Sequence, residues 1–271
     1  MLLNKCSPGS YEFDSKLIQK NHQTIAVSVL AIEGDVSFDY CTALAQRLAV
    51  PVTNDIHDNG GFVLACQDGR LVLYDTRDQK SRPLCIDFSA QDLRPYGPNL
   101  SRRQPLARAL GKHNRTVIDA TAGLGQDAFL MAAMGYLVLA IERSQVLAAL
   151  LDDAITVSAS DPRLARTLRG TLTTLAGDAR KLIPLQEPVD VIYLDPMFPP
   201  KRSKSALPRR ELVLLRELVG EDPDADQLFL TALQHAKNRL VVKRPLYAPP
   251  LVREPDFSQT GKLVRYDVYL C

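Results

Sequence analysis

Two patterns of apolar and polar positions divide the chain near residue 90. Before this point, short apolar runs separated by turn residues predict a small α+β unit. Within it, Asp68 and Gly69 mark the turn of a β-hairpin. The predicted elements of this part are strands at 24–32 and 84–88, a helix at 39–49 and a hairpin at 61–75. Residues 91–103 contain two prolines and a glycine and predict a loop or linker.

From residue 116 onward, short continuous apolar runs alternate with stretches of helical periodicity. This alternation is typical of a parallel sheet covered by helices on both faces. The sequence therefore predicts an α/β, doubly wound sheet in residues 91–271, preceded by a small α+β domain in residues 1–90. The predicted strands are 116–120, 137–142, 172–176, 189–194, 239–243 and 262–270, and the predicted helices are 104–111, 126–134, 145–158, 207–219 and 224–237. Ser144 is the expected N-cap of the longest helix.

The composition narrows the class of protein. The chain has 271 residues and a net charge of +2, and no apolar run approaches the roughly 20 residues of a membrane span. Its first residues lack the apolar core of a signal peptide. The five cysteines include no CxxC pair and the four histidines show no metal-ligand spacing, so neither a metal site nor a disulfide framework is indicated. We expect a cytoplasmic protein that uses no metal.

Residues 116–127 combine a strand, a turn of small residues and the start of a helix. The strand ends in Asp119, and the turn contains Gly123 and Gly125. Small residues let backbone N–H groups approach a ligand closely, which is how α/β proteins present a nucleotide-like ligand to the carboxyl end of a sheet. The spacing Gly123-x-Gly125 alone is a weak signal, because a glycine in a turn often serves only the turn.

Acidic residues follow four successive strands of the predicted sheet, at Asp119, Glu142, Asp178 and Asp195. Acids repel phosphate, so this edge suits a ligand with hydroxyls and amines. Glu142 comes 19 residues after Gly123, where an acid can accept hydrogen bonds from both ribose hydroxyls. That spacing fits a dinucleotide as well as an adenosyl ligand. When Glu142 or Asp178 is considered alone, a solvated or helix-capping acid is a better interpretation than a ligand contact.

The fourth strand end points to a particular chemistry. Asp195 and Pro196 supply a carboxylate and a rigid backbone carbonyl, and Phe198 supplies an aromatic ring. The two oxygens can accept both N–H groups of an exocyclic amine while the ring stacks on the base that carries it. Such positioning aligns a nitrogen nucleophile with an electrophilic methyl group. The simpler alternative is a proline-rich turn with Phe198 in the core.

On these residues the chain resembles the class I S-adenosylmethionine (SAM)-dependent methyltransferases, and more closely the RsmJ family of 16S ribosomal RNA guanine-N2 methyltransferases. The first 90 residues match only loosely. The resemblance implies a Rossmann-like fold and methyl transfer from SAM to the N2 amine of a guanosine in 16S ribosomal RNA or the small ribosomal subunit. The matching segments are 117–129, Glu142-Arg143 with 146–155, 193–207 and 241–251.

The resemblance also implies the residues that do the work. Gln126 departs from the arginine common in relatives, and Asp178-Ala179 stands where relatives have two small hydroxyl residues. Asp195, Pro196 and Phe198 are the implied catalytic residues. The implied SAM contacts are Gly123, Gln126, Asp127, Glu142, Arg143, Asp178, Ala179 and Asp195.

Lys201, Arg202 and Lys204 form part of a basic segment that we expect to bind the RNA backbone. A solvated surface loop is the alternative. Lys243 and Arg244 are weaker candidates for the same role. Two other functions stay open at this point: a nicotinamide-dependent oxidoreductase, which leaves 195–200 and the basic segment without a role, and a non-catalytic RNA-binding module.

Overall fold

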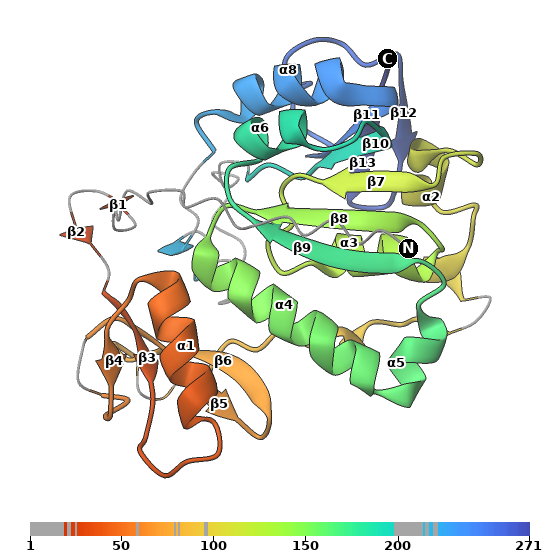
Figure 1. The fold of residues 1–271 in the computed structure, drawn as a ribbon. Coiled ribbons are helices and arrows are strands. Elements are labelled where there is room, and N and C mark those ends of the chain that lie inside the picture. The colour runs from red at the N-terminus through yellow and green to blue at the C-terminus, as the bar shows by residue number, and fades with distance from the viewer. Residues whose placement is uncertain are drawn as a thin grey trace, which may run out of the picture.

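A computed structural model describes residues 26–57, 60–78, 82–94, 97–197 and 222–271, together with 19–20, 23–24, 80, 214 and 217–218. Its main sheet has seven strands in the order β12-β13-β11-β10-β7-β8-β9 (Figure 1). The strands are β7 Thr116–Asp119, β8 Leu137–Glu142, β9 Thr171–Ala176, β10 Val189–Leu194, β11 Ala236–Pro245, β12 Phe257–Thr260 and β13 Val264–Leu270. In the described residues, no helix combines the length and apolarity needed to span a membrane.

The five strands β7 to β11 are parallel, and β13 is antiparallel to both of its neighbours. The chain builds outward from β7 through β8 to β9, then returns to the other side of β7 with β10. The strand order therefore reverses between β7 and β10, and the carboxyl ends of these strands share one edge of the sheet. In open α/β sheets, this reversal point is where ligands bind.

Helices cover both faces of the sheet because neighbouring strand residues point to opposite sides. Val117 and Tyr193 belong to the core under α3 and α4, whereas Ile118 and Ile192 belong to the core under α6 and α8. Figure 1 shows these two layers on either side of the sheet. The helices of this part are α2 Pro105–Leu110, α3 Gln126–Ala133, α4 Gln145–Ser160, α5 Pro162–Thr167, α6 Ala179–Leu182 and α8 Ala225–His235.

The N-terminal part forms a separate sheet in the order β4-β3-β5-β6, with helix α1 packed on β3. Asp68 and Gly69 both have positive φ in the turn between β5 and β6, as the predicted hairpin requires. The predicted strand 84–88 shrinks to a bridge from Leu84 to Leu73, followed by a short 3₁₀ turn. The elements are β1 Gln19–Lys20, β2 Gln23–Thr24, β3 Val27–Leu30, α1 Phe38–Leu48, β4 Val52–Thr53, β5 Phe62–Gln67 and β6 Arg70–Asp75.

One apolar core runs from this N-terminal part into the main sheet. The rings of Phe88 and Phe129 stack with centroids 4.1 Å apart. The backbone N–H of Leu71 donates to the carboxylate of Asp153 on α4 at 3.0 Å. The two parts are therefore joined by packing as well as by the chain, and a domain boundary at residue 90 stays a prediction.

Several boundaries differ from the sequence prediction for local physical reasons. Asp161 caps α5 and Pro162 fills its first position, a start signal that the apolar pattern does not show. The predicted helix 224–237 ends at His235 because β11 already begins at Ala236. Strand β12 lies in residues 244–261, a proline-rich segment between two predicted strands for which the sequence predicts no element. Most of the predicted helix 207–219 lies outside the described residues. Ser144 caps α4 by accepting a hydrogen bond from the N–H of Leu147, as predicted.

Replacing Phe88 by alanine is expected to lower the free energy of unfolding by about 3–5 kcal/mol, since it removes a buried ring and leaves a cavity against Phe129. Urea denaturation followed by circular dichroism measures the loss. Val36→Ala is the control, because Val36 is fully exposed and its truncation should change stability by less than about 0.5 kcal/mol. A Phe88→Ala loss as small as that of the control would contradict the joint core.

Candidate functional site

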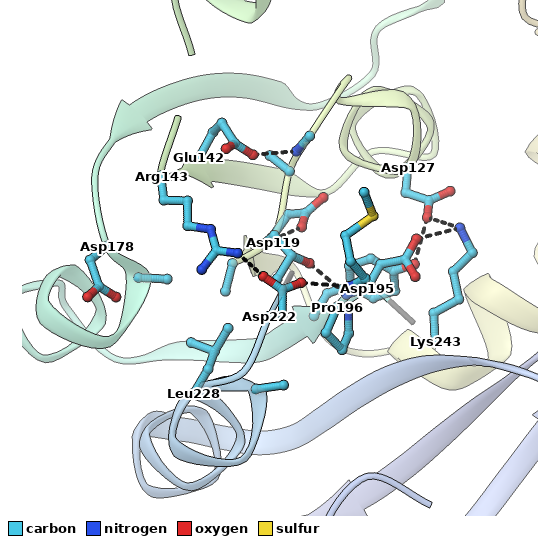
Figure 2. Close-up of a pocket in the computed structure, with 18 of the residues that line it drawn as sticks. Asp119, Asp127, Glu142, Arg143, Asp178, Asp195, Pro196, Asp222, Leu228 and Lys243 are labelled. Atoms are coloured by element: carbon cyan, nitrogen blue, oxygen red, sulfur yellow. Dashed lines mark hydrogen bonds and ion pairs between the residues drawn. The ribbon is translucent and has the colours of Figure 1, made fainter. Parts of the chain in front are cut away.

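A pocket of about 290 Å³ lies at the carboxyl edge of the sheet, where the strand order reverses (Figure 2). Seven carboxylates and three cationic side chains line it, so the pocket is acidic. The carboxylates are Asp119, Asp127, Glu142, Asp178, Asp195, Asp222 and Asp224, and the cations are Arg143, Arg180 and Lys243.

The fold brings most of the predicted site residues together around this pocket. The residues that line it are Gly123, Gln126, Asp127, Glu142, Arg143, Asp178, Ala179, Asp195 and Pro196. They come from segments between residues 123 and 196 that meet only because the parallel strands end at one edge. Four other predicted site residues, Phe198, Lys201, Arg202 and Lys204, lie outside the described residues. The binding and catalytic roles of both groups remain predictions.

The turn after β7 depends on glycine. Gly123 and Gly125 have φ values of 54° and 69°, a region that favours glycine. A Cβ atom at Gly125 would also lie 2.3 Å from Cδ1 of Leu151 on α4, well inside contact distance. The turn can therefore pack against α4 and start α3 at Gln126 only without a side chain here. This packing places the backbone of the turn along the wall of the pocket.

Glu142 is buried, with 3% of its surface exposed, at the end of β8. Its two carboxylate oxygens accept the backbone N–H groups of Gly123 and Ser144, each at 2.8 Å. Burial raises the pKa of Glu142 above its ordinary value although these two hydrogen bonds oppose the shift. The side chain thus fixes the glycine turn to the start of α4, and each oxygen keeps a second lone pair for a ligand hydroxyl.

Asp178 follows β9 and caps the short helix α6. Its carboxylate accepts hydrogen bonds from the backbone and the guanidinium of Arg180, the latter at 2.7 Å. Burial alone would raise the pKa of Asp178, but the hydrogen bonds from Arg180 outweigh it and hold the pKa below its ordinary value. Asp178 is therefore ionised at neutral pH and lies beside a cation.

Arg143 connects the end of β8 to the segment before α8. Its guanidinium pairs with Asp222, and with Asp224 at 3.4 Å. The second oxygen of Asp222 accepts the backbone N–H of Met197 at 2.6 Å. Figure 2 shows Asp222 between Arg143 and Pro196. Asp222 thereby links the predicted cofactor residue Arg143 to the segment that carries Asp195 and Pro196.

A second group of charges surrounds Asp195. The ammonium nitrogen of Lys243 lies 2.7 Å from Oδ2 of Asp127 and 2.9 Å from Oδ2 of Asp195. The hydroxyl of Tyr193 donates to Asp127 at 2.6 Å. The sequence made Lys243 a weaker candidate for binding RNA. The structure corrects this prediction, because the Lys243 side chain points into the pocket and pairs with two acids (Figure 2). Arg244 is likewise buried and donates to the carbonyl of Pro249.

The backbone at Asp195 is fixed from the neighbouring strand. Its N–H donates to the hydroxyl of Thr121, in the glycine turn, at 2.6 Å. Asp119, at the end of the same strand as that turn, is buried, and burial followed by the charge of Asp127 raises its pKa well above the ordinary value. Burial is also the largest influence that raises the pKa of Asp195, although Lys243 opposes it.

Sequence reasoning did not single out Tyr193, Arg180, Asp222 or Asp224. Tyr193 carries the polar group among the four buried residues at the end of β10, which is a weak signal. The run Asp222-Pro-Asp224 precedes a helix and reads as capping chemistry, so only the tertiary fold shows that it lies over Arg143. Arg180 follows Asp178 by two residues, and a pairing of this kind depends on the local turn.

The charged and polar groups of the pocket fit SAM better than a dinucleotide. The pocket offers carboxylates for a cation and for hydroxyls, and an apolar wall at Leu124, Ala225 and Leu228 for a flat ring. A pyrophosphate would meet the same carboxylates and be repelled. Within the part of the chain that the structure describes, no group of three or more His, Cys, Asp or Glu residues is placed to hold a metal ion.

Comparisons with known proteins show the family of the chain. A family model described as "Putative SAM-dependent methyltransferase" matches residues 43–271. The chain is similar to ribosomal RNA small subunit methyltransferase J of Actinobacillus pleuropneumoniae serotype 5b, with 39% identity over 79% of this chain and 88% of the relative. The corresponding protein of Thioalkalivibrio sulfidiphilus is 41% identical over 84% and 91%. That of Haemophilus influenzae is 37% identical over 92% and 97%.

A solved structure supports the fold. The crystal structure of a SAM-dependent methyltransferase from Neisseria gonorrhoeae matches with a TM-score of 0.66 and 27% identity, over 90% of this chain and 96% of that one. The predicted Rossmann-like class I fold is thereby confirmed. The chain belongs to the SAM-dependent methyltransferases, in the family that includes ribosomal RNA small subunit methyltransferase J.

Proposed function

We propose that this protein transfers the methyl group of SAM to the exocyclic N2 amine of a guanosine in 16S ribosomal RNA. The observation that carries the proposal is the joint placement of an acidic, cofactor-sized pocket and the Asp195-Pro196 strand end at one edge of the sheet. The relatives are named as small-subunit ribosomal RNA methyltransferases, which supports an RNA substrate. The predicted RNA contacts Lys201, Arg202 and Lys204 fit such a partner by their charge.

The residues present suit the parts of SAM. Glu142 supplies carboxylate oxygens for ribose hydroxyls, as an acid at the end of the second strand does in nucleotide-binding sheets. Asp178 and Ala179 at the end of β9 supply an acceptor and a small surface for the adenine. Gln126 and Asp127, at the start of α3, are available for the amino-acid end. Bound SAM supplies an electrophilic methyl group on a positively charged sulfur, and the acidic lining favours that charge.

The target amine is assigned to the end of β10. The carboxylate of Asp195 and the carbonyl of Pro196 are both hydrogen-bond acceptors, so together they suit the two N–H donors of a planar amine. Only Oδ2 of Asp195 has a recorded partner among the described residues, namely Lys243, and 38% of this side chain is exposed to the pocket. The fixed backbone at Asp195 limits how far the amine can turn.

The chemical step requires little more than positioning. The amine nitrogen forms a bond to the methyl carbon while the carbon–sulfur bond breaks and its electron pair stays on sulfur. The nitrogen then carries a positive charge and releases one proton, which Asp195 is placed to accept and pass to water. The protein contributes by orienting the amine and by holding negative charge beside the sulfonium.

The other two functions are less well supported. A nicotinamide-dependent oxidoreductase conflicts with the family of the chain and with the acidic pocket. A non-catalytic RNA-binding module would keep the fold without turnover, and it is separated from the proposed enzyme by a direct assay.

The purified protein is expected to transfer labelled methyl from SAM to small ribosomal subunits or free 16S ribosomal RNA isolated from cells that lack its gene. Nuclease digestion and mass spectrometry should show one additional N2-methylguanosine. Fully methylated RNA from the parent cells is the control and should accept no label. Binding of the RNA without any transfer would support the non-catalytic module instead.

Asp195→Ala is expected to reduce the rate of methyl transfer well over tenfold, on the order of 10²-fold, because the amine loses an oriented acceptor. Single-turnover kinetics at saturating SAM measure the chemical step. Glu187→Ala is the matched control, since Glu187 is an exposed acid just before the opposite end of β10. An unchanged rate in Asp195→Ala would remove this residue from the mechanism.

Acidification should weaken the binding of SAM more than that of S-adenosylhomocysteine. Because burial raises the pKa of Asp119, Glu142 and Asp195, these groups take up protons at a higher pH than ordinary carboxyl groups as the pH falls. Each proton removes a negative charge that attracts the sulfonium, which the product lacks. Between pH ~8 and ~5.5 we expect the ratio of the two Kd values (SAM over product) to rise about fivefold. Isothermal titration calorimetry at constant ionic strength measures both, and a constant ratio would contradict this electrostatic role.

A further inference from the structure

We infer that Lys243 is a positioning residue of the transfer reaction, which holds the carboxylate of Asp195 in place against Asp127 and keeps it charged while the amine binds. The inference rests on the proposed function. Lys243 lies in residues 241–251, one of the segments on which the chain resembles the family. The proposed mechanism gives this segment no role.

Strand pairing places Lys243 opposite the target site. In the parallel register of β10 and β11, Leu194 lies beside Val242, so Lys243 and Asp195 are the next residues on neighbouring strands. The Lys243 side chain is 23% exposed, and its ammonium lies within hydrogen-bond distance of the carboxylates of Asp127 and Asp195. A largely buried lysine is stable only with such partners.

The second partner is itself held in place. Asp127 lies in the first turn of α3. Its carboxylate accepts a hydrogen bond at 2.6 Å from the hydroxyl of Tyr193, a fully buried residue of β10. Lys243 therefore connects the carboxylate of Asp195 to a well-held partner, Asp127. Thr121 fixes the backbone of Asp195 from the other side. With both ends fixed, the remaining carboxylate oxygen is presented in one direction.

Lys243 is also the cation that offsets the acids around Asp195. The titratable and charged groups that face Asp195 come from β7, α3, β10, β11, β13 and the segment before α8, and Lys243 is the cation that pairs with Asp195. They are Asp119, Asp127, Tyr193, Tyr266, Asp222 and Lys243. Neighbouring carboxylates cannot all stay ionised without a compensating charge.

The direction of the effect follows from these neighbours. Burial raises the pKa of Asp195, Asp127 and Asp222 add to the rise, and Lys243 lowers it. The two carboxylates raise the pKa of Lys243 above its ordinary value despite its burial, so it stays charged at any pH used for an assay. Without Lys243, Asp195 would hold a proton to a higher pH, and a protonated carboxyl is a poorer acceptor for the amine.

The test compares Lys243→Met with the wild type in single-turnover methyl transfer to undermethylated small subunits across pH ~5.5 to ~9. We expect the acidic limb of the Lys243→Met rate profile to move upward by about one pH unit, so that on this limb the rate falls by up to about tenfold and recovers at high pH. Lys243→Arg keeps the charge and should keep the limb near its wild-type position. Lys243→Gln is a second neutral variant in case the methionine variant does not fold.

Lys237→Met is the matched control, because Lys237 is an exposed lysine at the opposite end of the same strand. Its profile should coincide with that of the wild type. If the neutral variants bind S-adenosylhomocysteine and show the wild-type pH profile, the inference is wrong. If the wild type itself transfers no methyl group to the RNA, the proposed function fails, and this outcome is distinct from a normal wild-type profile with unshifted variants.

Discussion

The structure depends on compensating the negative charge that the parallel sheet collects at its carboxyl edge. Seven carboxylates line one pocket, and three cations from different elements lie among them. Arg180 pairs with Asp178 and Asp224, Arg143 with Asp222 and Asp224, and Lys243 with Asp127 and Asp195. Because each cation contacts two carboxylates, the side chains are ordered, while the pocket as a whole keeps an excess of negative charge for a cationic ligand.

The fold explains why this arrangement is possible. Acids lie at the ends of β7 and β8 and just after β9 and β10, and backbone hydrogen bonds set the position of Glu142 through Gly123 and Ser144. The neutralising cations come from different elements: Arg143 follows β8, Arg180 belongs to α6 and Lys243 to β11. The ligand site is therefore assembled by tertiary packing of elements far apart in the sequence, and its geometry rests on the glycine turn that lets α3 and α4 approach.

The strand ends and the long helices could be predicted from the sequence because their signals are local: apolar runs, the cap at Ser144 and the turn at Gly123. The pairing of Lys243 with Asp195 could not, because it depends on the register between β10 and β11, which no local pattern encodes. Asp222 was missed for the same reason, since its partners Arg143 and Met197 are distant in sequence. Strand β12 was missed because a short edge strand in a proline-rich segment has little apolar periodicity.

The hydrogen bond between Asp222 and the backbone of Met197 has an evolutionary consequence. It holds Met197 and Asp222 at neighbouring points beside the pocket, although the two residues are 25 positions apart in the sequence. When two points of a chain are held this close together, the chain between them can lengthen or shorten with a small cost in closure entropy. Insertions or deletions between these two points would therefore leave the methyl-donor pocket unaltered.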